Sequence, residues 1–81
     1  MEQVEINAGS WYLRALRPDD WAADTGYAWA VCEPTTGEPF AEVTADPASG
    51  EVTVQGDAEA AKAGADAVRR FLLQLVAKPG Q

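Results

Sequence analysis

The sequence predicts an α+β fold: an antiparallel meander of four to five strands with one long C-terminal helix packed on one face. Short runs of alternating apolar residues, separated by turn residues, fill the chain as far as Gly56. A helical period of apolar residues then takes over. The 81 residues contain no linker or repeat, so residues 1–81 are expected to form a single small domain.

The first part of the chain predicts two strands followed by a compact turn. Val4 and Ile6 indicate the first strand, residues 7–10 a turn, and residues 11–16 the second strand. Residues 17–24 then read as a turn or a short helix, because Pro18 suits the first helical position. These two strands give no usable pairing register.

The middle of the chain predicts three strands joined by two hairpin loops. The strands span residues 27–33, 40–45 and 51–55. The loops at 34–37 and 46–50 each contain a glycine that can adopt positive φ.

The last third predicts the helix. Asp57 is suited to the N-cap and Glu59 to the first turn, where negative charge is favourable, while Lys78 and Pro79-Gly80 suit the end. One broad apolar face, small in its first half, predicts that another element approaches closely. Its members are Ala61, Gly64, Ala65, Val68, Phe71, Leu72, Leu75 and Val76.

Register determines which strand residues share a face. Four-residue loops at 34–37 and 46–49 would place Val31 opposite Phe40 and Val43 opposite Val52. The helix would then cover a face of small residues: Ala28, Ala30, Cys32, Ala41, Val43, Ala45, Val52 and Val54.

The other face of this predicted sheet would carry a cluster too apolar to remain exposed on a monomer. We expect it to be an interaction surface, with Glu42 and Glu51 setting its charge preference: Tyr27, Trp29, Val31, Phe40, Glu42 and Glu51. Three covers are considered: the segment carrying Trp21, a second copy of the chain, or a different protein or apolar ligand. On this hypothesis Trp29→Ala abolishes association without unfolding the chain.

The charge pattern limits the classes of molecule that the chain is expected to bind. The formal net charge is −7, and ten acidic residues but no Lys or Arg lie between Pro18 and Ala61. Such a field repels nucleic acid and anionic membranes, whereas a basic protein would be attracted. The first residues lack the pattern of a signal peptide, so a cytoplasmic location is expected.

The inventory of chemically active side chains is small. There is no histidine, and the single cysteine, Cys32, cannot form an internal disulfide. We therefore expect no catalytic residues, no metal site and no cofactor, and the chain is not expected to be an enzyme.

The stretches "YLRALRPDDWAAD", "YAWAVCEPTTGEPFAEV", "GEVTV" and "AKAGADAVRRFLLQLV" together resemble the first half of a GNAT-type acetyltransferase. The resemblance implies that acyl-CoA phosphates bind where the last helix begins. The phosphate-binding loop would fall on residues 61–66 and would end on Asp66, a departure from the family pattern, and the later strands of that fold are absent.

These observations lead to one expected function and two alternatives. We expect a small acidic non-enzymatic protein that acts by protein–protein association, as a homodimer or as a regulator of a more basic partner. The first alternative is a ligand-binding, vestigial GNAT-like acyl-CoA module without catalysis. The second is an acidic antitoxin-like or decoy inhibitor.

Overall fold

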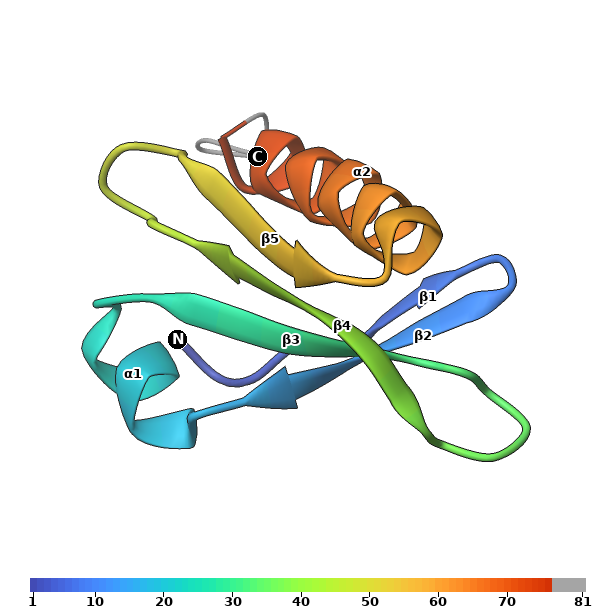
Figure 1. Ribbon diagram of the computed structural model, residues 1–81. Coiled ribbons are helices and arrows are strands. Elements are labelled where there is room, and N and C mark those ends of the chain that lie inside the picture. The colour runs from blue at the N-terminus through green and yellow to red at the C-terminus, as the bar shows by residue number, and fades with distance from the viewer. Residues whose placement is uncertain (77–81) are drawn as a thin grey trace.

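The computed structural model describes residues 1–76 and confirms the α+β fold (Figure 1). Five strands form one antiparallel sheet in the order β1-β2-β3-β4-β5, so each strand pairs with its neighbour in sequence. A short helix, α1, follows the second strand, as one of the two sequence readings expected, and a long helix, α2, follows the fifth. The elements are β1 (Ile6–Ala8), β2 (Trp11–Leu16), α1 (Pro18–Ala23), β3 (Tyr27–Cys32), β4 (Pro39–Ala45), β5 (Val52–Gly56) and α2 (Ala58–Val76).

Helix α2 begins as the sequence predicts and packs along β4 and β5 (Figure 1). The Asp57 side chain caps it by accepting the Ala60 amide hydrogen at 3.0 Å, which satisfies one of the first unpaired amides. The expected end at Lys78 and Pro79-Gly80 lies outside the described residues.

The small residues of α2 allow its close approach to the sheet. Gly64 is buried, and a Cβ atom there would lie 2.6 Å from Cγ2 of Val31 and 2.7 Å from Cγ2 of Val43. The predicted close approach is therefore confirmed. The side chains that contact Gly64 are these two valines. Val31 of β3, which was expected to face away from the helix, therefore faces it.

A β-bulge in β4 explains this difference. The loop at 34–37 forms as predicted, since the Glu33 amide donates to the Glu38 carbonyl at 2.9 Å. Cys32 then pairs with Pro39 but Val31 pairs with Ala41, so Phe40 is an extra residue without an opposite partner. Every later pair is shifted by one, and a shift of one residue turns β3 over relative to the prediction.

The predicted sidedness of β3 is therefore wrong. Tyr27, Trp29 and Val31 share the helix-facing side with Ala45, Val43 and Ala41, while Ala28, Ala30 and Cys32 face away from α2. For β4 and β5 the predicted sidedness is correct, although the register in which the two strands pair differs from the predicted one by two residues. Ala45 pairs with Val52, not with Gly50, and a shift of two leaves each side chain on its predicted face.

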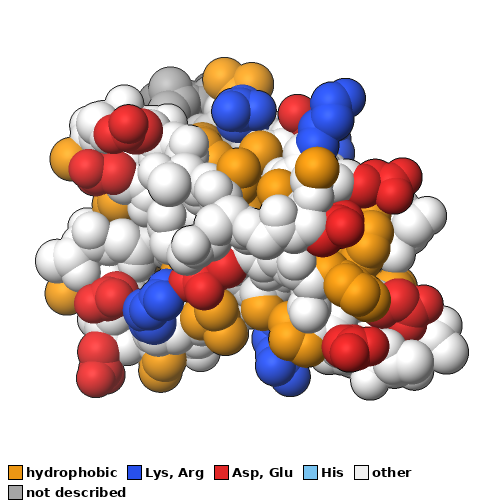
Figure 2. Space-filling model, viewed as in Figure 1, with side chains coloured by type: hydrophobic (Ala, Val, Ile, Leu, Met, Phe, Trp, Pro, Cys, Tyr) orange, Lys and Arg blue, Asp and Glu red, His pale blue; other side chains and the backbone are white. Residues whose placement is uncertain are grey.

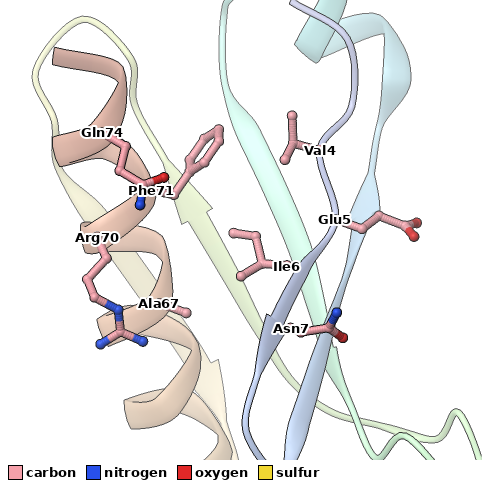
Figure 3. A pocket seen from close by; sticks show the side chains of 8 residues that line it. All are labelled: Val4, Glu5, Ile6, Asn7, Ala67, Arg70, Phe71 and Gln74. Carbon is pink, nitrogen blue, oxygen red and sulfur yellow. The ribbon is translucent and has the colours of Figure 1, made fainter. Parts of the chain in front are cut away.

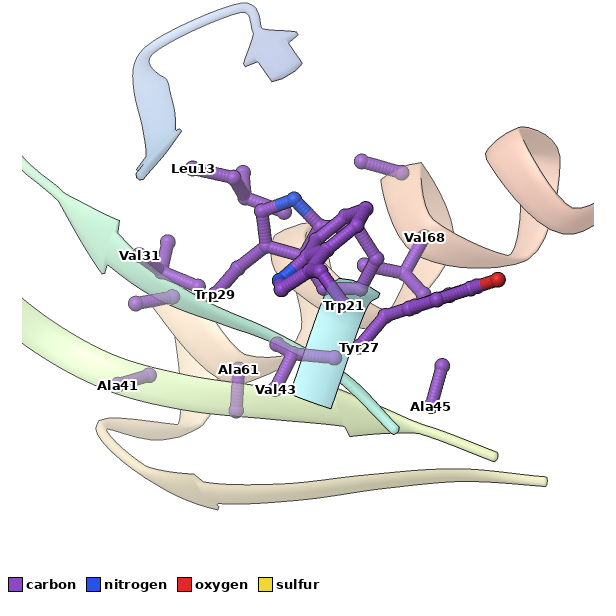
Figure 4. Close-up of a cluster of buried hydrophobic side chains, with 12 residues drawn as sticks. Leu13, Trp21, Tyr27, Trp29, Val31, Ala41, Val43, Ala45, Ala61 and Val68 are labelled. Carbon is purple, nitrogen blue, oxygen red and sulfur yellow. The ribbon is translucent and has the colours of Figure 1, made fainter. Parts of the chain in front are cut away.

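The aromatic side chains form the centre of the hydrophobic core (Figure 4). Trp21 of α1 folds over β3, stacking on Tyr27 with ring centroids 4.5 Å apart and meeting Trp29 edge to face at 5.0 Å. Phe71 of α2 contacts Trp29 as well, with ring centroids 5.6 Å apart, and lies 6.4 Å from Trp21. The segment carrying Trp21 is thus the cover of Tyr27 and Trp29, one of the three alternatives considered, and α2 completes it.

Candidate interaction surface

The structure separates the six residues predicted to form an interaction surface. Tyr27, Trp29 and Val31 are buried in the core, at 5 %, 0 % and 0 % exposure, and cannot contact a partner while the chain is folded this way. Phe40 is 41 % exposed and lies beside Trp11, with ring centroids 5.6 Å apart. The two acidic members, Glu42 and Glu51, both keep contact with solvent.

Tyr27 is held in the core by a polar contact at its outer end. Its hydroxyl donates a hydrogen bond to Oδ1 of Asp24 at 2.8 Å, and Asp24 also accepts from the amino group of Met1 at 3.1 Å. Burial, and then the bond to Asp24, raise the pKa of Tyr27 from 10.0 to about 12. The bond to Tyr27 also lowers the pKa of the Asp24 carboxyl.

We predict an alkaline loss of stability that depends on Tyr27. A pKa raised in the folded state stabilises the fold fully below pH 10, the ordinary value, and this contribution is lost as the pH rises through about 12. Urea unfolding at stepped pH, with tyrosinate absorbance recorded in parallel, measures it. In Tyr27→Phe the decline between these two pH values should be smaller, and an unchanged decline would contradict the assignment.

The sheet face opposite α2 carries small side chains along β3. Ala28, Ala30 and Cys32 are nearly inaccessible there, although α2 lies on the other side of the sheet. Larger side chains flank each of them on the neighbouring strands: Leu16 and Thr44 beside Ala28, Arg14 and Glu42 beside Ala30, and Tyr12 and Pro39 beside Cys32. As a buried thiol, Cys32 acts as a small apolar residue, although not in the core where it was predicted.

One ion pair joins the end of β2 to this face. Nη2 of Arg17 lies 2.6 Å from Oε2 of Glu42, with side-chain exposures of 49 % and 29 %. Because both groups are partly solvated, the pair contributes little to stability. It also neutralises Glu42, one of the two carboxylates expected to set charge preference, so Glu51 is the more available of the two.

A second surface lies between the β4–β5 hairpin and the adjoining flank of α2. A mainly apolar hollow there is lined by Gly50, Arg69, Leu72 and Leu73, and Leu73 is 67 % exposed. Val54 of β5 and Leu75 of α2 are also exposed, at 39 % and 42 %, but Leu75 is two positions from Leu73, about 200° around the helix, and lies on another side of α2. Figure 2 shows hydrophobic side chains at the surface over α2, next to Lys and Arg side chains. Leu73 signalled this surface in the sequence, since it lies among the charged positions of the helix.

A groove of about 340 Å³ separates the opposite flank of α2 from the N-terminal segment (Figure 3). Ile6 and Phe71 point into it from the two sides, and Glu5 points away. Arg70 is the cation of the lining, which contains no nucleophile and no pair of titratable groups placed for acid–base chemistry. The lining residues are Val4, Glu5, Ile6, Asn7, Ala67, Arg70, Phe71 and Gln74.

The start of α2 is poorly suited to the phosphates that the GNAT resemblance implies. The Asp57 carboxylate occupies the position of an incoming anion by accepting the Ala60 amide hydrogen, and Glu59 adds a second negative charge to the first turn. Among residues 1–76, no group of three or more acidic or cysteine side chains is arranged to hold a metal ion.

Comparisons with protein-family models, curated proteins and solved structures found no significant match to this chain. In the part of the chain that the structure describes, neither helix combines the length and the hydropathy needed to span a bilayer.

Proposed function

We propose that this protein acts by association with other protein chains, first of all with a second copy of itself, and not by catalysis. The observation that carries the proposal is the mainly apolar hollow of Gly50, Arg69, Leu72 and Leu73, where Leu73 is 67 % exposed, together with the unpaired edge of the sheet at β5. Apolar side chains gathered at one exposed site favour a protein interface, because burying them releases ordered water.

The acidity of the protein also suits a more basic partner. The net charge of −7 provides long-range attraction to a cationic protein. Glu51, directly before β5, is exposed at the same edge of the sheet, on the face turned away from α2. We propose that such a partner would bind at the same edge of the sheet and that Glu51 determines its charge preference.

We also propose a cytoplasmic location, where the buried Cys32 thiol would stay reduced.

The molecular mass in solution tests the proposal. At micromolar concentration we expect a species of twice the single-chain mass of 8.6 kDa, and dilution should convert it to the monomer. Leu73→Glu should weaken this association, because it places a charge in the apolar surface, while Gln74→Glu, one position along on the other flank, serves as the matched control. A mass that stays monomeric up to millimolar concentration would exclude self-association.

A further inference from the structure

Strand β5 is an open edge of the sheet whose outward backbone groups can be identified. The Asp46 amide donates to the Glu51 carbonyl and the Asp57 amide to the Phe40 carbonyl, both at 2.9 Å. In an antiparallel ladder, hydrogen-bonded and non-hydrogen-bonded pairs alternate, so Thr53 and Gln55 also bond to β4. The amide and carbonyl groups of Val52 and Val54 therefore point outward, away from the sheet.

This edge lacks the features that protect sheet edges from pairing. Natural edge strands carry lysine, proline or a bulge, or are covered by another segment. Residues 52–56 contain neither lysine nor proline, pair with β4 without a bulge, and have high β propensity at Val52, Thr53 and Val54. A strand from another chain could therefore pair with β5 in a regular ladder.

We infer that β5 pairs antiparallel with β5 of a second copy across a two-fold axis at Thr53, giving one continuous ten-stranded sheet. This inference rests on the proposed self-association and specifies its site. Val52 then lies opposite the second copy's Val54, and the outward groups of both strands are satisfied. Both valines face the helix side of the sheet, so their side chains extend the core across the junction.

Charge selects this register over the alternative centred on Val54. With the axis at Thr53, Glu51 lies opposite the second copy's Gln55, whose amide can donate to the carboxylate. With the axis at Val54, Glu51 would lie opposite Asp57, and like charges directly opposite each other are destabilising. At the axis itself the two Thr53 side chains meet, a cross-strand pair that is favourable in sheets.

The helices support the same arrangement. Neighbouring strands lie about 4.8 Å apart. Two helices that each lie over β4 and β5 are then separated by about 10 Å, the upper end of the packing distance of about 8–10 Å. Arg69 and Leu73 line the flanks that face each other.

Val54→Pro tests the pairing. Proline removes the outward amide of residue 54 without removing a hydrogen bond to β4, as edge positions permit. We expect the parent chain to be a dimer and Val54→Pro to be a monomer with an unchanged far-UV circular dichroism spectrum. Val54→Ala, which keeps the amide, should still dimerise and is the matched control.

Thr53→Cys tests the register independently of any loss of folding by the proline variant. Non-hydrogen-bonded partners in an antiparallel pair have Cα atoms about 4.5 Å apart, within reach of a disulfide. Mild oxidation should therefore link two Thr53→Cys chains covalently, whereas Gln55→Cys, and Thr53→Ser with only Cys32, should remain unlinked. A parent dimer that survives Val54→Pro and does not crosslink at residue 53 overturns this interface but leaves the proposed function intact. A parent chain that never dimerises overturns both.

Discussion

Trp29→Ala is expected to unfold this protein. The indole is fully buried and contacts both Trp21 and Phe71, so its removal leaves a large cavity at the centre of the core. Truncating a buried tryptophan costs about 3–5 kcal/mol. The variant also loses the hydrogen bond from Nε1 to the Val4 carbonyl at 2.7 Å, worth about 1 kcal/mol. Since 81 residues typically give a stability of roughly 4–12 kcal/mol, most of it would be lost.

Urea unfolding followed by far-UV circular dichroism measures this loss. Trp29→Phe, which keeps a ring in the site, should retain most of the stability. Phe40→Ala is the matched control at the surface, because its side chain is 41 % exposed, and we expect it to remain folded. If Trp29→Ala stays as stable as the parent and loses only association, the indole faces a partner and the described core is wrong.

That outcome is the one the sequence alone predicted, and the error has a single physical origin. The elements, their order and the loop at 34–37 were predicted correctly, because turn residues and apolar periodicity are local signals. An exception is the turn predicted at residues 7–10, since Asn7 and Ala8 lie in β1. A bulge changes no local pattern, yet one extra residue at Phe40 inverts the relation of β3 to β4. Pro39 was the available signal, since proline within sheets is confined to strand starts, edges and bulges.

The candidate site was harder to predict than the fold for the same reason. An exposed surface is what remains after the core has been chosen, so inverting β3 moved its three predicted surface residues inside. The inverted arrangement buries Trp29 and Tyr27 together with Trp21, which removes far more apolar area from water than burying Ala28 and Ala30 against α2 would. The predicted sidedness of β5 was correct because the error in its register was an even number of residues.

Gly64→Ala is expected to destabilise the protein, contrary to the general effect of this substitution in helices. In an exposed helix interior, replacing glycine by alanine gains about 1 kcal/mol. Here the added methyl group would lie within 2.7 Å of Cγ2 of both Val31 and Val43, and a valine methyl cannot swing away as the end of a long side chain can. Overpacking of this kind costs about 1–3 kcal/mol, so the net effect is a loss of up to about 2 kcal/mol.

A double-mutant cycle isolates the cause of this loss. Val43→Ala is destabilising alone, because it leaves a cavity under α2, but it also makes room for the methyl group at position 64. The loss of stability in the double variant should therefore be smaller than the sum of the losses in the two single variants. Urea unfolding of all four chains measures this coupling. Ala63→Gly, the neighbouring position in the same helix, controls for helix propensity. Additive losses, or a Gly64→Ala variant more stable than the parent, would mean that α2 does not rest on these two valines, and the close contact that positions it beside β5 would have to be abandoned.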